Sequence, residues 1–248
     1  MSEAVLEARG LSRRFGGLLA VADVSLALRP GSAHAVIGPN GAGKSTLINL
    51  LSGALRPDNG GVHLDATDVT SLPDWRRARA GIGRSFQRTT LFPAMTVLEN
   101  ARLAAQSTMH FWRLFSGASH DAAMLEQATG ALHQAGLAAL ANNLASTLSH
   151  GQRRLLEIAL VLASGPRVLL LDEPLAGLGP DEIAPVEELL RSLATSHAML
   201  LVEHDMDVVF AVADTVTVMV DGRVLETGTP DMIRRSATVR DAYLGHRG

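Results

Sequence analysis

The segment GPNGAGKST has the residue types and spacing of a phosphate-binding loop. It matches G-x-x-x-x-G-K-[ST], and its glycines let backbone N–H groups turn inward toward anionic oxygens. Lys44 is expected to bridge the β- and γ-phosphates of a nucleotide. The Ser45 hydroxyl is a candidate ligand for Mg²⁺, and Thr46 for the α-phosphate. The binding residues predicted from this loop are Gly38, Pro39, Asn40, Gly41, Ala42, Gly43, Lys44, Ser45 and Thr46.

A phosphate-binding loop of this type needs an acidic residue on a neighbouring strand, and VLLLDE at 168–173 supplies it. Asp172 ends an apolar run and is expected to hold Mg²⁺, through water. Glu173 follows directly, where a carboxylate can orient and deprotonate an attacking water. The sequence therefore predicts Asp172 as a metal residue and Glu173 as the catalytic base.

Three further residues fit around the γ-phosphate and the base of a nucleotide. Gln87 follows a short predicted strand and is expected to contact Mg²⁺ or the attacking water. His204 ends the apolar run AMLLVEH and is a candidate donor to the γ-phosphate. Phe15 lies in the strand-rich start of the chain, where its ring can stack on adenine. Taken singly, His204 would be interpreted as structural and Phe15 as a core residue, so both assignments depend on the phosphate-binding loop.

The segment LSHGQRR at 148–154 is open to three interpretations. Ser149 beside His150 suggests a hydrolytic nucleophile and its base, Ser149 alone suggests a helix N-cap, and the whole segment suggests a phosphate contact. Adjacent residues at a helix start point apart, and the chain has no G-x-S-x-G elbow, which argues against a hydrolase. The helix N-cap and the phosphate contact both stay open at this point, with Ser149, Gly151 and Gln152 as the residues concerned.

The elements that must position these residues alternate between strands and helices. Apolar strands are predicted at 33–38, 167–173 and 198–204, and amphipathic or apolar helices at 44–53 and 180–194. A strand-rich start precedes the phosphate-binding loop, a helical stretch covers roughly 95–163, and a hairpin on an Asp-Gly turn covers 215–228. Such alternation predicts a parallel, doubly wound α/β sheet that is interrupted by a helical insertion.

Composition narrows the classes of function. A net charge of −3 gives no basic footprint for nucleic acid, and the absence of cysteine excludes thiol catalysis and disulfides. The N-terminus has no run typical of a signal peptide, and no window of 18 apolar residues occurs, so a cytoplasmic location is expected. The arginine-rich segment WRRAR at 75–79 is interpreted as a solvated helix face rather than a lipid contact.

Taken together, these motifs resemble those of the nucleotide-binding subunit of ATP-binding cassette (ABC) transporters, over about residues 4 to 245. The resemblance implies a P-loop NTPase of α/β class: one domain at 4–245 with an antiparallel β subdomain and P-loop core at 4–90, a helical subdomain at 91–163, a RecA-like core at 164–228 and a C-terminal tail at 229–248. It also implies that Phe15 stacks on adenine and that Gln87 links ATP to membrane subunits. His204 would be the switch histidine.

Finer features, among them GRSFQRTTLFPAMTVLEN at 83–100 and LLVEHDMDVVF at 200–210, are similar to those of branched-chain amino-acid importer ATPases, with urea and amide importers close behind. Two positions depart from the family pattern. His150 replaces the first glycine of the usual LSGGQ, a position where this subfamily often carries a larger residue. Gly179 stands where the D-loop usually has aspartate, which puts a contact across the dimer in doubt.

The resemblance also implies partners. Each phosphate-binding loop would be closed by Ser149 Oγ, the Gly151 N–H and a helix start of a second ATPase subunit, so that two ATP molecules join the pair. The partner would be another copy or a paralogue. Transmembrane permease subunits would dock near 87–100, a solute-binding protein would act indirectly, and the ATPase would lie peripherally on the cytoplasmic face of the inner membrane. Guanine-reading and kinase-lid features are missing from the sequence, which disfavours other P-loop classes.

Overall fold

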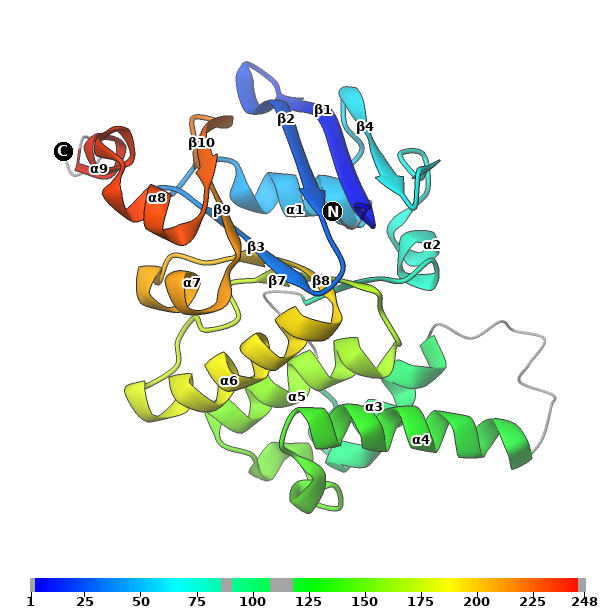
Figure 1. Cartoon of the computed structure of the whole chain (residues 1–248). Helices are drawn as coiled ribbons and strands as arrows, with labels where there is room; N and C mark the ends of the chain where they lie inside the picture. Colours follow the sequence, from blue (N-terminus) through cyan, green and yellow to red (C-terminus); the bar gives the residue numbers. More distant parts are fainter. Residues whose placement is uncertain (1–2, 86–90, 108–117, 245–248) are drawn as a thin grey trace.

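The computed structural model describes residues 3–85, 91–107 and 118–244. The apolar strands predicted at 33–38, 167–173 and 198–204 form the centre of a six-stranded sheet (Figure 1). The strand order is β10-β9-β3-β8-β7-β6, and all neighbours are parallel except β10 and β9. The strands are β3 (Ser32–Ile37), β6 (Ile82–Arg84), β7 (Val168–Asp172), β8 (Ala198–Val202), β9 (Thr215–Val220) and β10 (Arg223–Gly228). The predicted parallel sheet and the hairpin are confirmed.

Both faces of this sheet are covered, which explains why its central strands show no polar alternation. In β7, Val168 and Leu170 pack on the side of helix α1 (Lys44–Ser52), whereas Leu169 and Leu171 pack against the helical layer on the other side. All four side chains are 0% exposed. A polar substitution at any of them would bury an unpartnered group on one face or the other.

A second, antiparallel sheet of order β2-β1-β4-β5 covers the far side of α1 (Figure 1). Leu6 at the start of β1 pairs with Leu28 of β2 and with Leu64 of β4, so the three strands share one buried row. The strands are β1 (Leu6–Phe15), β2 (Leu18–Leu28), β4 (Asn59–Leu64) and β5 (Thr67–Asp68). The strand-rich start of the sequence thus forms a layer that covers the helix carrying Lys44.

Helices make up the layer on the opposite face of the main sheet (Figure 1). Three of them come from the predicted helical insertion between β6 and β7, and α3 packs against both α4 and α5. The helices of this layer are α3 (Val97–Ser107), α4 (Ala118–Gln134), α5 (His150–Ala163) and α6 (Pro180–Ser196), with short 3-10 turns at Ala138–Leu140 and Ala145–Thr147. Helix α5 carries the segment LSHGQRR at its start, so the packing of this layer sets where that segment lies.

The C-terminal part of the chain packs against β3 and β9, near the β10 edge of the sheet. Ile233 and Val239 from this part join Val209, Val216 and Val218 in a third apolar cluster. The helices involved are α7 (Met206–Val212), α8 (Pro230–Arg235) and α9 (Ala237–Leu244). In the part of the chain that the structure describes, no helix combines the length and apolar character needed to cross a membrane.

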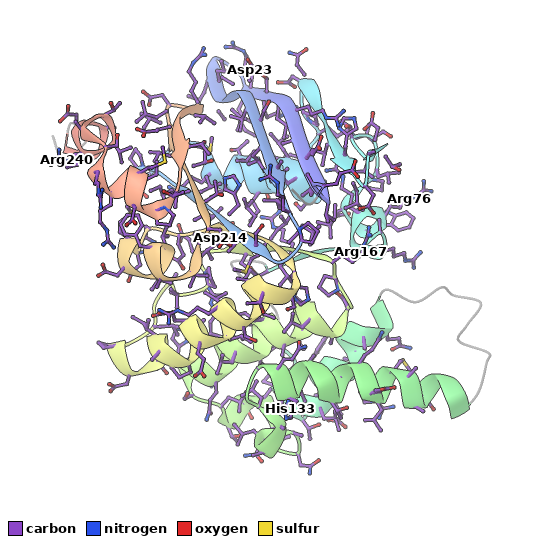
Figure 2. The ribbon with its side chains drawn as sticks, in the orientation of Figure 1. Asp23, Arg76, His133, Arg167, Asp214 and Arg240 are labelled. Carbon is purple, nitrogen blue, oxygen red and sulfur yellow. The ribbon has the colours of Figure 1, made fainter. Side chains whose placement is uncertain are left out.

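Helix α2 (Asp74–Arg79) corrects one expectation from the sequence. Arg76 and Arg79 are exposed and lie over the Trp75 ring, as a solvated face requires. Figure 2 shows Arg76 at the surface of the molecule. Arg77 is instead 0% exposed, and it donates to the Leu50 and Leu51 carbonyls at the end of α1. The interpretation of the whole segment as a solvated face is therefore wrong at Arg77, because a guanidinium can leave water when its N–H groups all find acceptors.

Candidate functional site

The loop between β3 and α1 has a shape that only glycine permits at two of its positions. Gly38 has φ of +156° and Gly43 has φ of +97°. A Cβ atom added to Gly38 would lie 2.1 Å from the Met219 carbonyl oxygen, and one on Gly43 would lie 2.2 Å from that of Ala20. Both obstacles are backbone atoms, so they cannot turn aside as a flexible side chain would. The glycines therefore let the loop pass close to two strands while it curves into α1.

The start of α1 offers donors to an anion. Its N-cap is Gly43, which makes no side-chain capping hydrogen bond, and its first turn contains no acidic residue. The first N–H groups of a helix lack acceptors within the helix, and the helix dipole favours negative charge there. Ser45 is exposed and Thr46 is half-buried in this same turn. The geometry fits a phosphate group held by backbone N–H groups and hydroxyls.

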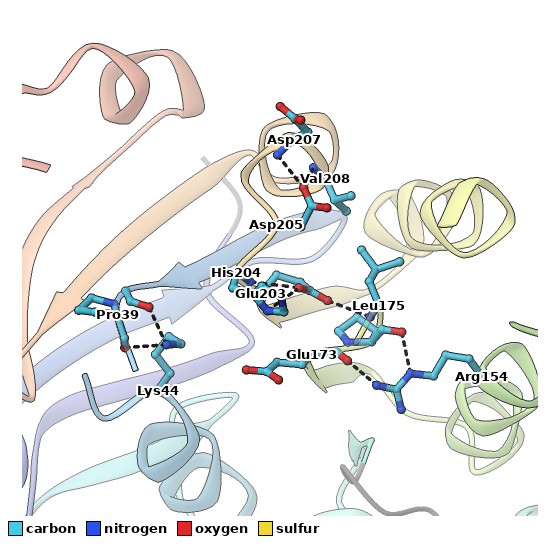
Figure 3. A network of polar contacts seen from close by, with 12 residues as sticks. Pro39, Lys44, Arg154, Glu173, Leu175, Glu203, His204, Asp205, Asp207 and Val208 are labelled. Carbon is cyan, nitrogen blue, oxygen red and sulfur yellow. Dashed lines mark hydrogen bonds and ion pairs between the residues drawn. The ribbon is translucent and has the colours of Figure 1, made fainter. Parts of the chain in front are cut away.

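Lys44 brings a cation to the same loop. Its side chain is buried, and Nζ donates to the carbonyl oxygens of Gly38 at 2.7 Å and Pro39 at 3.0 Å (Figure 3). Burial lowers the pKa of Lys44, while the negative charges of Glu173 and Asp172 act in the opposite direction. The ammonium thus curls back over its own loop, where it lies in the field of both predicted carboxylates.

Asp172 is the last residue of β7 and is 2% exposed. Its Oδ2 lies 3.8 Å from Arg84 Nη2, and its N–H donates to Ser85 Oγ at 3.1 Å. Burial raises the pKa of Asp172, and the Arg84 charge opposes that rise. Among the described residues, Oδ1 of Asp172 is buried and finds no hydrogen-bond donor. A carboxylate oxygen in this state fits a ligand that the polypeptide does not itself supply.

A divalent metal fits this donor set. Mg²⁺ prefers hard oxygen ligands and keeps several of its waters. The unpartnered Oδ1 of Asp172 and the exposed hydroxyl of Ser45 are oxygens of this kind. No cluster of three or more His, Asp or Glu side chains able to hold a metal on its own occurs among the described residues. The protein's contribution to a metal site would therefore be completed by oxygens of a nucleotide and by water.

Glu173 stands on a strained piece of backbone directly after β7. Its φ is +48°, in the left-handed region that residues other than glycine rarely adopt. Its N–H donates to the Val202 carbonyl at 2.8 Å, and its carbonyl accepts from Arg154. Figure 3 shows its carboxylate directed toward the side of the site where Lys44 lies. The surrounding hydrogen bonds fix a conformation that the chain would not keep by itself.

His204 follows β8, and its side chain is 66% exposed. Its N–H donates to Oε2 of Glu203 at 3.1 Å, and Nδ1 lies 3.7 Å from the same oxygen. Glu203 is 0% exposed, and its Oε1 accepts from the Leu175 N–H at 2.9 Å. Burial raises the pKa of Glu203, and hydrogen bonds from backbone N–H groups, first those of Leu175 and His204, oppose that rise. One buried carboxylate thus joins the segment after Glu173 to the residue predicted as the switch histidine (Figure 3).

The segment LSHGQRR forms the start of α5 with a complete capping box. Ser149 is the N-cap; its Oγ accepts from the Gln152 N–H at 3.2 Å, and its own N–H donates to Gln152 Oε1 at 2.9 Å. The predicted N-cap is confirmed. The same bonds show that Gln152 has a structural task at this helix start, whatever it contacts in addition.

Gly151 already has an anionic partner in this chain. Its N–H donates to Oε1 of Glu182 at 2.7 Å, and Oε2 of that carboxylate accepts from the Gly179 N–H at 3.2 Å. These two backbone donors, first Gly151 and then Gly179, lower the pKa of Glu182. The donor predicted to contact a phosphate is therefore one that binds a carboxylate when the chain is alone.

Two predicted residues lie away from these contacts. Phe15 is the last residue of β1; it is 44% exposed, and the Arg13 guanidinium carbon lies 5.1 Å from the centre of its ring. Its stacking on adenine stays a prediction. Gln87 falls within 86–90, outside the described residues, so its predicted contact also stays a prediction.

Four residues of the site were not singled out from the sequence. Arg84 reaches Asp172 from β6 and also donates to Asn49 and Ser52 of α1. Glu203 carried a weak signal, because an acidic residue at the end of an apolar strand is uncommon. The other two residues, Glu182 and Arg154, act through contacts between elements far apart in the sequence. No local pattern identifies partners of that kind.

Comparison with known proteins agrees with this geometry. The chain matches the ABC transporter family over residues 21–176 and, at its end, the branched-chain amino acid ATP-binding cassette transporter family over residues 223–248. It is 42% identical to the high-affinity branched-chain amino acid transport ATP-binding protein LivG of Salmonella typhimurium, with 99% of each chain covered. It is 40% identical to the corresponding protein BraF of Pseudomonas aeruginosa, again with 99% of each covered.

Solved structures give the same result for the fold. The ADP conformation of an ATP-binding cassette of an ABC transporter superposes with a TM-score of 0.85 at 28% identity, covering 99% of this chain and all of that one. A nucleotide-free cassette gives a TM-score of 0.84 at 28% identity, over 97% and 99% of the two chains. The α/β fold predicted from the motifs is confirmed, and the family match covers more than half of the chain. The chain therefore belongs to the ATP-binding cassette family of ABC transporters.

Proposed function

We propose that this protein is the ATPase subunit of an importer for branched-chain amino acids. It would act on the cytoplasmic face of the membrane, with separate permease subunits and a solute-binding protein that selects the cargo. The relatives named for branched-chain amino acid transport, similar over the full chain, support the choice of cargo. The observation that carries the enzymatic part is the buried, unpartnered Oδ1 of Asp172 beside Glu173 and a phosphate-binding loop.

The chemistry follows from the position of each group. The N–H groups at the start of α1 and the Lys44 ammonium would hold the β- and γ-phosphates of ATP, stabilising the negative charge that grows during transfer. To do so, Lys44 exchanges its present acceptors, the carbonyls of Gly38 and Pro39, for phosphate oxygens. A bound Mg²⁺ would supply neutralising charge between the phosphates, held by Ser45, Asp172 and Gln87.

Glu173 would act as the general base on the attacking water, and His204 would donate to the γ-phosphate. The strained backbone at Glu173 supports this role, because such conformations persist where the surroundings hold a functional group in place. Phe15 would stack on adenine. Ser149, Gly151 and Gln152 of a second ATPase subunit, another copy or a paralogue, would close the site over the γ-phosphate.

The replacement of Glu173 by Gln tests the enzymatic part. Glutamine keeps the size of the side chain but cannot accept the proton, so we expect hydrolysis to fall by about 10²–10⁴-fold while ATP still binds. The exposed Glu188→Gln variant is the matched control and should keep full activity. If Glu173→Gln hydrolyses ATP at the wild-type rate, the assignment of the base is wrong.

The cargo is tested with the whole transporter. Proteoliposomes that contain the permease subunits, this ATPase and its partner should take up leucine when ATP and the solute-binding protein are present. Urea and acetamide serve as competing substrates for the alternative assignment. Uptake of urea without uptake of leucine would contradict the proposed cargo and leave the ATPase assignment intact.

A further inference from the structure

Arg154 joins the helix of the LSHGQRR segment to the backbone that carries the catalytic base. It lies in the second turn of α5, and its side chain is 12% exposed. Its Nε donates to the Pro174 carbonyl at 2.6 Å, and one terminal nitrogen donates to the Glu173 carbonyl (Figure 3). The other terminal nitrogen bonds Glu157 Oε2 at 2.7 Å. All three guanidinium nitrogens are therefore engaged, and two of them bind consecutive carbonyls of the catalytic segment.

These two carbonyls belong to a segment that is held from several elements. The Glu173 N–H is bound by Val202 of β8, and the Leu175 N–H is bound by the Glu203 carboxylate at the end of β8. Arg154 adds the contact from the helical layer. The left-handed φ of Glu173 makes the direction of its carboxylate sensitive to these anchors, because the backbone has no strong preference of its own for that conformation.

The Arg154–Glu157 ion pair fixes the direction of the guanidinium. Both side chains are mostly buried, and they lie three residues apart on α5. One terminal nitrogen of Arg154 bonds this carboxylate, and the planar guanidinium then presents its other N–H groups in a fixed direction, which a lysine cannot reproduce. Glu157 therefore aims the fork of Arg154 at the two carbonyls, and any movement of α5 is passed to them.

We propose that Arg154 is a positioning residue that holds the carboxylate of Glu173 for catalysis and ties it to the start of α5. The inference rests on the proposed function. Ser149 and Arg154 lie five residues apart on one helix, and a helix moves as a unit over this distance. A change at the N-terminus of α5, where the nucleotide of the opposite site would bind, therefore reaches the base of this chain's own site. Each ATP site would sense the other through one arginine.

The neighbouring Arg153 provides a matched control. It is exposed on the same helix and donates to the Ser146 carbonyl at 3.1 Å, away from the two carbonyls that Arg154 binds. A pocket of about 440 Å³ adjoins Arg154, lined by His150, Arg153, Arg154, Glu157, Glu173 and Ala176. Removal of the Arg154 side chain would enlarge this open pocket, so that a free guanidinium ion can enter.

The experiment compares Arg154→Ala, Arg154→Lys and Arg153→Ala in the full ATPase pair, with steady-state hydrolysis and nucleotide binding measured for each. We expect Arg154→Ala to lower kcat by about tenfold or more, because a small displacement of a catalytic group has a large kinetic cost. KM for ATP and ATP-driven dimerisation should stay within about twofold, since Lys44 and Ser149 are intact. Millimolar guanidinium should restore part of the hydrolysis rate of Arg154→Ala. The kcat of Arg154→Lys should lie between those of Arg154→Ala and the wild type, and the kcat of Arg153→Ala should resemble that of the wild type.

Two results would overturn the inference. Wild-type kcat in Arg154→Ala would show that the carbonyl contacts do not position the base. Equal losses of nucleotide binding, dimerisation and kcat, without recovery in guanidinium, would show a structural role only. Glu173→Gln, measured alongside, separates the two proposals: if it is inactive while Arg154→Ala is fully active, only this inference fails, and if it is active, the proposed function itself fails.

Discussion

Replacement of Arg77 by alanine should be one of the most damaging single changes outside the nucleotide site. Arg77 donates to the Leu50 and Leu51 carbonyls at 2.8 Å each, to the Thr70 carbonyl at 2.9 Å and to the Leu72 carbonyl at 3.1 Å. The first two are buried carbonyls at the end of α1, where the last carbonyls of a helix have no donors within the helix. The substitution removes the Arg77 donor from both carbonyls and leaves the Leu50 carbonyl with the longer contact from the Gly53 N–H, at 3.4 Å.

The size of the effect can be worked from these contacts. A buried carbonyl without a donor costs about 1–3 kcal/mol, and part of this loss is offset because the guanidinium no longer has to leave water. With two buried carbonyls and two partly buried ones, we expect a loss of about 3–5 kcal/mol in the free energy of unfolding. For a chain of this size, 1 kcal/mol shifts Tm by about 2–4 °C, so Tm should fall by about 6–20 °C.

Differential scanning calorimetry of Arg77→Ala, Arg77→Lys and Arg76→Ala checks this reasoning. Arg77→Lys should lose an intermediate amount, because one ammonium cannot reach four carbonyls in the directions that the guanidinium serves. Arg76 is exposed on the same helix, so its removal should change the free energy of unfolding by no more than about 0.5 kcal/mol. A Tm for Arg77→Ala within about 2 °C of the wild type would refute the argument that these carbonyls depend on Arg77.

Two further predictions concern the site. Gly43→Ala should weaken ATP binding by about tenfold or more and lower Tm, because the new Cβ would meet the Ala20 carbonyl at a position of positive φ. Titration of a fluorescent nucleotide measures the binding, and Gly17→Ala, whose new Cβ would meet open space, is the control. Equal binding by both variants would contradict the prediction. Burial raises the pKa of Glu203, so the folded chain keeps the proton on this carboxyl to higher pH than the unfolded chain does. The contribution of Glu203 to the free energy of unfolding therefore falls as pH rises from the ordinary glutamate range through the raised pKa. The Tm of Glu203→Gln relative to the wild type should therefore rise over that interval and then level off, whereas a difference that does not change with pH would show that the residue titrates alike in both states.

The sequence was sufficient for the parts of the site that depend on local order. The phosphate-binding loop could be located because the glycine spacing and Lys44 occur within nine residues and a predicted helix follows. Asp172 and Glu173 could be located because they end a strand too apolar to lie anywhere but inside a parallel sheet. The N-cap role of Ser149 follows from residue type and from the start of the helical pattern.

The remaining contacts depend on which elements meet in space. The segment WRRAR predicts a solvated face that includes Arg77, and nothing in the local pattern shows that the end of α1 lies beneath this residue. Arg154 belongs to the LSHGQRR segment, but its partners at Glu173 and Pro174 follow only from the packing of α5 on the sheet. A pattern of hydrophobic residues predicts which face of a helix is buried, but it does not name the backbone atoms that face meets.

The bond between Glu182 and the Gly151 N–H would affect how easily the proposed nucleotide can leave. For the phosphate that we propose at this helix start, binding is an exchange of one anion for another. The free energy gained is therefore only the difference between the phosphate contact and the carboxylate contact. The carboxylate that is displaced stays attached to the same chain, close to the site. Its effective concentration there remains high, and it can return as soon as the phosphate moves away. The chain thus carries its own competitor for the donor, which favours reversible capture over tight retention.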